Sequence, residues 1–454
     1  MIFFSGGISP PLKTQNDGAA PLIELTIVFR GNFYMQQHGI SKLDLKRQNR
    51  MQVLKILKRL GPTSRIDIAN MLHLTRAAVT IITNEMIDQG IIVEVGEYKH
   101  TLDKAPRGRK KILIDINQNY KFVLGVCVEE DIVSVGLSTL SGLVLDKRNK
   151  QIDENAEYDD ITDFIKDSIK SILTDNCLKN CDLLGIGFGV FPSMFSRLKV
   201  VIENGEPNYI HLADDIYAQF PVPLIFDNSV KGTAMANIDF LPDKDKNRRN
   251  IAYLQIGNSI HFVVANLNDP IVSYDNRTDF VDKMIVNKNS AFRCPKCGRR
   301  GCAENEVSIP AIVKRVRGIH SANKTPTLFK LTGGDPDRIN INIIKRAYDA
   351  GDHSEISKII RIICDQYAVL INNLYFATNP QRIVIQCFYM TDKVYEDLMN
   401  SIEKIAGEEV KNKISLSIVE ERHRFLSGCA LAIRELFYTR GGFDTYAEDI
   451  HGDK

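Results

Sequence analysis

Apolar residues recur at intervals of three and four in three consecutive stretches of the chain, residues 49–60, 64–72 and 75–90. This spacing places the apolar side chains on one face of a helix, so each stretch predicts an amphipathic helix. The apolar positions are Val53, Ile56, Leu57 and Leu60 in the first stretch, Ile66, Ile68, Ala69 and Leu72 in the second, and Val79, Ile82 and Met86 in the third. We expect the three helices to pack their apolar faces together.

Turn and capping residues separate these helices. The pair Gly61-Pro62 ends the first helix, and Ser64 is a favourable N-cap for the second, with Asp67 three residues later. Residues 73–74 form the turn, and Thr75 caps the third helix. After the third helix, residues 91–95 and 98–100 are predicted to be the two strands of a wing. The pattern therefore predicts a winged helix-turn-helix domain over residues 41–103.

The positive charge of the helix-turn-helix region indicates the kind of partner that it binds. Residues 41–111 contain 15 Lys and Arg against 7 Asp and Glu, whereas residues 112–454 contain 41 against 47. A basic helix-turn-helix favours double-stranded DNA as its partner, while the alternative is a helical protein-interaction module. In the DNA interpretation, Arg76 contacts a guanine edge or a phosphate, the threonines contact phosphates, and Ala77 and Ile81 contact thymine methyl groups. The predicted DNA-contact set is Ser64, Arg65, Thr75, Arg76, Ala77, Thr80 and Ile81, together with Arg107 and Arg109.

The two arginines Arg107 and Arg109 belong to a basic segment, APRGRKK, within a predicted linker over residues 104–116. One interpretation is that they insert into the minor groove beside the third helix. The other is that the segment is a solvated run of charges. Before the helices, residues 1–40 are expected to form a weakly ordered extension, and Met35 is an alternative start, so the sequence leaves open whether residues 1–34 are translated.

From residue 117 the pattern changes to strands that alternate with helices, which predicts an α/β fold. Clear strand segments are FVLGVCV, IVSVGLSTL, LVLDKR and LLGIGFGVF, and helices are predicted at 341–348, 354–376 and 392–406. The glycines Gly185, Gly187 and Gly189 do not complete a dinucleotide-binding GxGxxG. No apolar run is long enough to span a bilayer and no secretion signal is recognisable, so we expect a cytoplasmic protein with no membrane partner.

Several motifs in this body, read with the helix-turn-helix, resemble a known family. They are GRK in the linker, LGVCVEEDIVSVGLSTLSGLVL, GIGFGVFP, DNSVKGTAMAN, CPKCGRRGCAE and NPQRIVI. Together they resemble the ROK family of repressors, open reading frames and sugar kinases, in its transcriptional-regulator branch. The resemblance implies an actin-like (ribonuclease H-like) two-lobed sugar-kinase fold over residues 117–454, used as a sensor, and a homodimer or homotetramer.

The family's kinase residues are missing at three places. The phosphate-binding DxGGT turn corresponds to residues 128–131, which hold Glu129, Glu130 and Asp131 and no glycine, and the loop GTGIGGG corresponds to residues 257–261, with one glycine left. Ser229 stands where the kinases have their catalytic aspartate. We therefore expect no enzymatic activity, no catalytic residues and no ATP cofactor.

The sugar contacts implied by the family are partly retained. Asn228, Ser229 and Glu304 are the predicted ligand-binding residues, whereas the family's Glu-x-x-His pair corresponds to Phe280 and Lys283. The alternative is that Asn228 is an ordinary turn residue and Glu304 an ordinary acid at a helix N-terminus. The sequence does not name an effector: a sugar, a sugar phosphate, another small molecule or none all remain open.

Three cysteines, Cys294, Cys297 and Cys302, lie within nine residues. Closely spaced thiols in a reducing compartment commonly hold zinc, so a structural zinc is predicted, with a metal-free cysteine-rich turn as the alternative. The family supplies a histidine as fourth ligand, but Lys283 or Met284 stands at that position. Asp282 and His261 are the candidates for the fourth ligand.

The leading hypothesis is a DNA-binding transcriptional regulator, specifically a repressor of carbohydrate-utilisation genes with a degenerate kinase-like sensor. An ATP-dependent sugar kinase with an attached DNA-binding domain is the alternative, and a ligand-free DNA-binding or scaffold protein is a third possibility. The operator, the target genes and the sign of regulation are not determined by the sequence.

Overall fold

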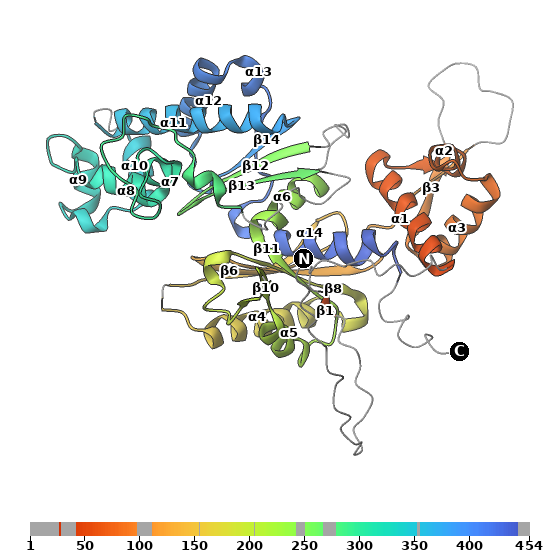
Figure 1. The fold of residues 1–454 in the computed structure, drawn as a ribbon. Helices are drawn as coiled ribbons and strands as arrows, with labels where there is room; N and C mark the ends of the chain where they lie inside the picture. Colours follow the sequence, from red (N-terminus) through yellow and green to blue (C-terminus); the bar gives the residue numbers. More distant parts are fainter. Residues whose placement is uncertain are drawn as a thin grey trace, which may run out of the picture.

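The computed structural model describes residues 27–28, 42–97, 111–153, 155–203, 205–241, 250–266, 278–351 and 355–443 (Figure 1). It contains a small helical domain and two α/β lobes. The elements of the helical domain are α1 (Lys42–Leu60), β2 (Thr63–Ser64), α2 (Arg65–Leu72), α3 (Arg76–Asp88), β3 (Ile92–Glu97) and β4 (Ile112–Ile116). The three predicted helices are confirmed, although α1 begins at Lys42, seven residues before the predicted start.

Both predicted helix caps of this domain are confirmed. The Ser64 hydroxyl accepts a hydrogen bond from the Asp67 amide (3.2 Å) and donates one to the Asp67 carboxylate (2.6 Å). The Thr75 hydroxyl accepts a bond from the Ala78 amide at 3.2 Å. Between the two helices His73 adopts a left-handed conformation with φ 54°, which turns the chain.

The wing differs from the prediction. Strand β3 pairs in antiparallel fashion with β4, and β4 also pairs with β2, so the sheet order is β2-β4-β3. Ile114 and Ile116 of β4 are buried in the core of the helical domain, which explains why this segment joins the sheet. Residues 112–116 were predicted to be linker, and that part of the prediction is wrong. Residues 98–100, predicted as the second wing strand, lie outside the described residues, in the connection between β3 and β4.

The first lobe is built on a six-stranded sheet of order β1-β11-β8-β5-β6-β7. Its strands are β1 (Ile27–Val28), β5 (Phe122–Val128), β6 (Ile132–Ser138), β7 (Val144–Gln151), β8 (Leu183–Val190) and β11 (Leu224–Asn228). The strand segments read from the sequence are thus confirmed. Residues 27–28, expected within a weakly ordered extension, pair in parallel with β11 at the edge of this sheet, and residues 1–26 and 29–41 lie outside the described residues.

Helices cover both faces of the first sheet (Figure 1). On one face lie α4 (Tyr158–Asp175) and α5 (Ile210–Tyr217), and on the other lie α6 (Ser229–Asp239) and α14 (Leu426–Ala432), which continues as the π-helix η6 (Ile433–Thr439). The remaining elements of this lobe are η1 (Asn180–Asp182), η2 (Pro192–Met194), η5 (Glu421–His423) and the hairpin β9 (Val201–Glu203) and β10 (Glu206–Asn208).

Glycines let α14 lie directly against the strands. A Cβ atom added at Gly187 of β8 would be 1.9 Å from the Gly428 carbonyl oxygen, and one added at Gly428 would be 2.2 Å from the Gly187 oxygen. A Cβ at Gly125 of β5 would be 2.1 Å from the Phe425 oxygen. Any side chain at these three positions would therefore push the helix off the sheet.

The second lobe has a four-stranded sheet of order β13-β12-β14-β15 with helices packed around it. Its elements are β12 (Asn250–Ile256), β13 (Ile260–Asn266), η3 (Phe280–Lys283), α7 (Ala303–Val307), α8 (Ile309–Arg317), α9 (Pro326–Thr332), η4 (Pro336–Arg338), α10 (Ile341–Asp349), α11 (Glu355–Thr378), β14 (Arg382–Gln386), α12 (Asp392–Ala406), α13 (Glu408–Lys411) and β15 (Ile414–Leu416). The three helices predicted in this region correspond to α10, α11 and α12. None of the described helices is long and apolar enough to cross a membrane.

Candidate functional site: an interlobe cavity, a nucleotide position, a cysteine cluster and a winged helix

A cavity of about 750 Å³ lies between the lobes. Its walls come from the segment that follows β8, the β9–β10 hairpin, the end of β11 with the start of α6, the start of β13, and the η3 and cysteine-rich segments. The volume is within the range of about 300–1,000 Å³ that is usual for small-molecule sites. The end of β11 in the first lobe and the start of β13 in the second lobe both border this cavity.

Of the three predicted ligand residues, Asn228 lines the cavity and the other two do not. The Asn228 side chain caps α6, because its Oδ1 accepts from the Val230 amide at 2.9 Å, while its Nδ2 donates to Thr278 Oγ1 at 3.4 Å. Ser229 is fully buried and faces the sheet, where it lies against Gly189. Glu304 is buried in the first turn of α7 and is paired with Lys296.

Two polar residues that the sequence analysis did not select as ligand contacts also line the cavity, Lys231 and His261, the second of which was selected only as a candidate zinc ligand. Lys231 lies in the first turn of α6, is almost fully buried, and places its Nζ 3.4 Å from Asp227 Oδ1. His261 has a ring nitrogen 2.7 Å from Ser259 Oγ and the other 2.9 Å from Thr278 Oγ1. Burial lowers the pKa of His261 to about 4, so its ring is neutral near pH 7. The signal available in the sequence was a lysine among small and apolar residues in the segment SVKGTAMA.

Aromatic rings and carboxylates dominate the rest of the lining. Phe226 stacks on Tyr209 with ring centroids 5.1 Å apart, and Phe191 also lines the cavity. Among the described residues the Tyr209 hydroxyl is buried without a hydrogen-bond partner. The acidic lining residues are Glu130, Glu203, Glu206, Asp227, Asp279 and Asp282, and the basic ones are Lys231 and Lys296. The described lining is therefore acidic overall.

The segment that corresponds, by the family resemblance, to the phosphate-binding turn of the kinases is part of an ionic cluster, and its surroundings are called the nucleotide position below. Nη1 of Arg424 lies 2.8 Å from Glu129 Oε2 and 2.8 Å from Asp131 Oδ1, and the Phe388 ring lies 4.1 Å from the guanidinium carbon. The cavity left there is only about 50 Å³. The sequence correctly placed the carboxylates, but it missed that Arg424, about 295 residues later, neutralises them. Because Arg424 neutralises the carboxylates, they would not exclude a phosphate by charge repulsion. The side chains of the cluster instead exclude it by occupying the space.

A further contact to this position comes from the second lobe. Asn258, in the turn between β12 and β13, donates from Nδ2 to Glu130 Oε2 at 3.0 Å. This bond joins the two loops that correspond, by the family resemblance, to the phosphate loops of the kinases. The loop at residues 257–261, in which one glycine is left, thus forms a bridge between the lobes.

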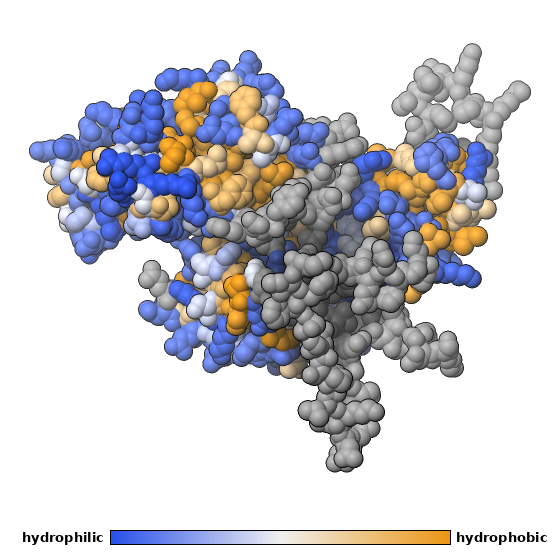
Figure 2. All heavy atoms as spheres, in the orientation of Figure 1, coloured by the Kyte–Doolittle hydropathy of each residue, from blue (hydrophilic) through white to orange (hydrophobic). Residues whose placement is uncertain are grey.

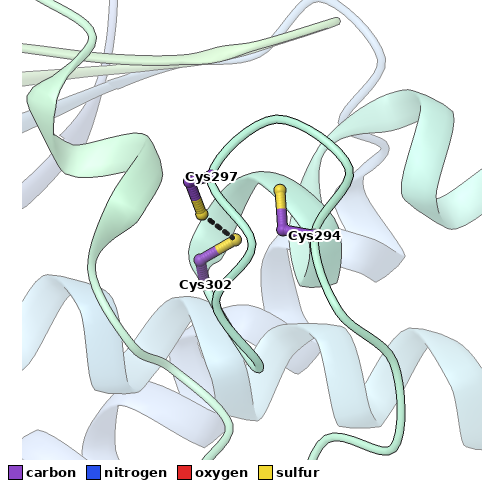
Figure 3. Close-up of side chains that lie close together, drawn as sticks. All are labelled: Cys294, Cys297 and Cys302. Carbon is purple, nitrogen blue, oxygen red and sulfur yellow. Dashed lines mark hydrogen bonds between the residues drawn. The ribbon is translucent and has the colours of Figure 1, made fainter.

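The cysteine cluster brings three sulphur atoms together (Figure 3). The Sγ atoms of Cys294, Cys297 and Cys302 all lie within 4.8 Å of one another, and those of Cys297 and Cys302 are 3.7 Å apart. Two sulphurs that are each about 2.3 Å from a tetrahedral zinc lie about 3.8 Å apart, so this spacing fits the metal. Gly301, with φ 70°, makes the turn possible, since a Cβ there would be 1.7 Å from the Asn287 oxygen.

Neither candidate for a fourth ligand joins this cluster. Among the described residues the group contains the three cysteines alone. Both ring nitrogens of His261 are already bonded to hydroxyl groups, and Asp282 lines the interlobe cavity. The residues present therefore fit a metal bound by three thiolates with one open or solvent-filled position.

In the winged helix, the start of α3 is exposed. Arg76, Ala77 and Thr80 are exposed, and Ile81 has 69% of its surface accessible. The Thr75 hydroxyl oxygen accepts the capping hydrogen bond from the Ala78 amide, and Thr80 Oγ1 donates to the Arg76 carbonyl at 2.7 Å. This surface forms a continuous outward face at the N-terminal end of the helix.

Two other members of the predicted DNA-contact set are bonded within the domain. Ser64 is buried at the cap of α2. Arg65 donates to Thr83 Oγ1 at 3.0 Å and to Glu94 Oε1 at 2.9 Å, which ties α2 to α3 and the wing. Arg107 and Arg109 lie outside the described residues, in the chain that connects β3 to β4.

Arg50 of α1 was missed by the sequence analysis. Its side chain is fully buried, and it donates to Gln89 Oε1 at 2.7 Å and to the Gly441 carbonyl at 2.9 Å. Its guanidinium carbon lies 3.9 Å from the centre of the Phe443 ring. Arg50 therefore joins α1 to the end of α3 and to the segment that follows η6.

Comparisons with known proteins agree with this architecture. The xylose repressor of Bacillus spizizenii is 22% identical over 379 residues, covering 82% of this chain and 94% of the repressor. The DNA-binding transcriptional dual regulator NagC of Escherichia coli is 25% identical over 369 residues, covering 77% of this chain and 82% of NagC.

Among solved structures, a ROK family transcriptional regulator described as a homologue of the E. coli MLC protein has a TM-score of 0.63 at 20% identity, covering 87% of this chain and 98% of its own. A ROK family glucokinase from Streptomyces griseus, in complex with glucose and AMPPNP, has a TM-score of 0.52 at 16% identity and covers 69% of this chain and 99% of its own. These likenesses confirm the predicted fold. The model of the ROK family matches residues 132–432, about two thirds of the sequence, and the chain belongs to the ROK family.

Proposed function

We propose that this protein is a sugar-responsive transcriptional repressor of carbohydrate-utilisation genes, acting on double-stranded DNA in the cytoplasm. The observation that carries the proposal is the combination, in one chain, of an exposed α3 surface with a ligand-sized cavity and a filled nucleotide position. The named relatives support the same assignment, since they are a xylose repressor and NagC. A sugar kinase with an added DNA-binding domain is disfavoured, because Arg424 and its carboxylates occupy the space that a triphosphate needs.

The proposed DNA surface is the N-terminal half of α3. Arg76, Ala77, Thr80 and Ile81 would face the major groove, with Thr75 at the helix N-terminus near a phosphate. Ser64 and Arg65 would act by fixing α2 against α3. Arg107 and Arg109, which lie between β3 and β4 in the sequence, would reach the minor groove, which changes their proposed role from linker to wing residues.

The proposed effector is a sugar that carries no phosphate. The aromatic wall formed by Tyr209 and Phe226 suits the apolar face of a sugar ring, and Asn228, Lys231 and Asp282 offer partners for hydroxyl groups. An acidic lining disfavours a phosphate, since a cleft focuses the negative potential of its carboxylates. A ligand-free scaffold role is disfavoured by the size of the cavity.

We also propose a structural zinc held by Cys294, Cys297 and Cys302. The ion would fasten the loop that carries Lys296 to the start of α7, beside the interlobe cavity. Its contribution would be to fix this loop, because zinc in such sites replaces the packing that a short glycine-rich loop lacks.

DNA binding should depend on Arg76 in a sequence-specific way. Arg76→Ala is expected to weaken binding to an operator selected by the protein from random duplexes by about 1–3 kcal/mol if the arginine reads a base edge. Mobility-shift titrations with the selected and a scrambled duplex measure this. The control is Arg338→Ala, an exposed arginine of the second lobe, which should leave both affinities unchanged.

The wing arginines should give a different signature in the same titrations. Replacing Arg107 and Arg109 together by alanine should weaken binding to both duplexes and flatten the dependence on salt, because fewer counterions are released. An unaltered salt slope would show that Arg107 and Arg109 belong to a passive tether, and unchanged affinity of Arg76→Ala for both duplexes would remove Arg76 from the interface.

Self-association should use an exposed apolar stripe on α11. Ile362, Val369 and Phe376 follow one another at intervals of seven residues, about two helical turns, and Ile362 and Phe376 are 51% and 73% exposed. Figure 2 shows apolar surface over the region of α11 and α12. We expect sedimentation to show a homodimer or homotetramer that Phe376→Ser weakens at least tenfold. A wild-type monomer at micromolar concentration would exclude a paired operator site.

One zinc per chain should be present in protein purified without chelator. Cys297→Ser should lose the metal and lower the melting temperature, whereas Cys177→Ser, an exposed cysteine outside the cluster, should keep both. Elemental analysis with thermal melts measures this. Metal-free wild-type protein would establish the cysteine-rich turn as the correct interpretation.

The protein should not phosphorylate sugars. A coupled assay with common hexoses and acetylated amino sugars should give no turnover on the usual enzymatic scale of about 1 per second or more, with a glucokinase as positive control. Ser229→Asp should remain inactive, because Arg424 still fills the nucleotide position. Turnover of any sugar by the wild type would favour the kinase alternative.

A further inference from the structure

A buried ionic cluster joins the winged helix to the first lobe. Nζ of Lys58, in the last turn of α1, lies 2.7 Å from Asp239 Oδ1. The same carboxylate accepts from Arg434 Nε at 2.6 Å and from Arg434 Nη2 at 2.9 Å. The side chains of Lys58, Asp239 and Arg434 are only 14%, 2% and 10% exposed. The Lys58 ammonium also lies 4.1 Å from the centre of the Tyr438 ring.

Asp239 is the last residue of α6, the helix whose other end forms part of the interlobe cavity. Asn228 caps the helix and Lys231 lies in its first turn, and both line the cavity. Eleven residues at about 1.5 Å each make the helix about 16 Å long, which spans the distance from the cavity wall to α1. Residues 229–237 are all buried, and a Cβ at Gly232 would be 2.6 Å from the Ser427 oxygen. A shift at the cavity end of this closely packed helix therefore reaches Asp239.

On the other side of the cluster, α1 is fixed to the proposed recognition helix. Arg50, two turns before Lys58, donates to Gln89 beyond the C-terminal end of α3 and forms an ion pair with Glu85 at 3.3 Å. A second ion pair joins Lys46 to Glu85 at 2.6 Å. A displacement of α1 therefore carries α3 with it, and the exposed Arg76 lies at the opposite end of that helix.

We propose that Lys58 and Asp239 form the joint through which occupancy of the interlobe cavity sets the position of α3. This rests on the proposed function as a ligand-responsive DNA-binding protein. Lys58 and Asp239 touch neither DNA nor ligand in this scheme, so they are positioning residues. A buried ion pair gains little net stability over an apolar pair, because desolvation offsets most of the attraction, but it accepts a narrower range of geometries. This property suits a joint better than a passive contact between domains.

The joint can be tested without knowing the effector, because coupling between two sites is reciprocal. If the cavity influences α3, then DNA bound to α3 must influence the cavity. The probe is a duplex that the protein itself selects from random DNA. Hydrogen–deuterium exchange of the full chain, with and without this duplex, should show changed protection in α3, in residues 230–239 of α6 and in residues 278–283 of the cavity wall.

Substitution of Lys58 should separate these effects. In Lys58→Met the duplex should still protect α3, but the change at α6 and at the cavity wall should fall at least fivefold. Lys58→Arg keeps the charge and donors and should restore it. Lys42→Met, which removes the same charge at the exposed first residue of the same helix, should behave as the wild type. Asp239→Asn is the second variant and should reproduce Lys58→Met from the side of the body.

The coupling should also depend on pH. Burial lowers the pKa of Lys58 to about 8, against the opposing attraction of Asp239, so the lysine loses its charge as the pH rises through 8. The groups that face it are Asp239 of α6, Arg434 and Tyr438 of η6, and Lys55 of its own helix. Neighbouring cations hold the pKa of Asp239 below its usual value despite burial, and burial raises that of Tyr438, so neither changes charge near pH 8.

Protection factors, which correct for the intrinsic pH dependence of exchange, should therefore show the cavity response of the wild type fading between pH 7 and pH 9. The response of Lys58→Arg should persist, because a guanidinium stays charged. A merely structural ion pair would weaken α3 protection in the variants and would not give this difference.

The outcomes are distinct. No DNA-induced change at the cavity in the wild type, or an equal change in Lys58→Met, overturns the joint and leaves the proposed function intact. Loss of α3 protection in Lys58→Met and Asp239→Asn with a lowered melting temperature would show that the pair only holds the domains together, and it also rejects the joint. Failure of the wild type to select any duplex would contradict the proposed function itself.

Discussion

The contact on which the rest of the molecule depends is the direct packing of α14 against β5 and β8. Gly187 and Gly428 meet backbone to backbone, and Gly125 admits the Phe425 carbonyl. This close approach places η6 and the residues after it beyond the edge of the lobe, where Arg434 reaches Asp239 and the Gly441 carbonyl reaches Arg50. The core that begins between α14 and the sheet continues without a break into the helices of the winged domain. The position of that domain therefore follows from three glycines.

The two sites of the sugar-kinase fold differ in how much open space they contain. The nucleotide position is filled by Arg424, which is paired with Glu129 and Asp131 and rests on the Phe388 ring. The neighbouring cavity stays open at about 750 Å³, with aromatic walls and an acidic lining. A buried charge is tolerated only with close partners, which Glu129 and Asp131 supply to Arg424.

Three cations of α1 contact different parts of the protein. Lys46 and Arg50 bond the C-terminal end of α3, and Lys58 bonds the body. Some of the basic residues that give this region its excess positive charge therefore form ion pairs within the protein and are not available to DNA. Arg65, also assigned to DNA, is likewise bonded to Thr83 and Glu94. Net charge along a sequence indicates a class of partner, but the individual residues are assigned only when their neighbours are known.

The sequence by itself determined the features that depend on near neighbours in the chain. The caps at Ser64 and Thr75 and strand β5 (Phe122–Val128) follow from local hydrogen bonding and apolar period, so they were predicted correctly. The spacing of Cys294, Cys297 and Cys302 likewise fixed a cluster of three sulphurs. Family resemblance identified the lobes and the loss of the kinase residues.

Only the tertiary structure decided the features that join distant parts of the chain. Pairing of β3 with β4 depends on the burial of Ile114 and Ile116, and the occupation of the nucleotide position depends on Arg424, 295 residues from Glu129. Asn228 faces the cavity and Ser229 faces Gly189 because α6 is fixed in rotation by its packing on α14. Such contacts join residues that are far apart in the sequence. Their energies depend on burial and distance, which the order of residues does not specify.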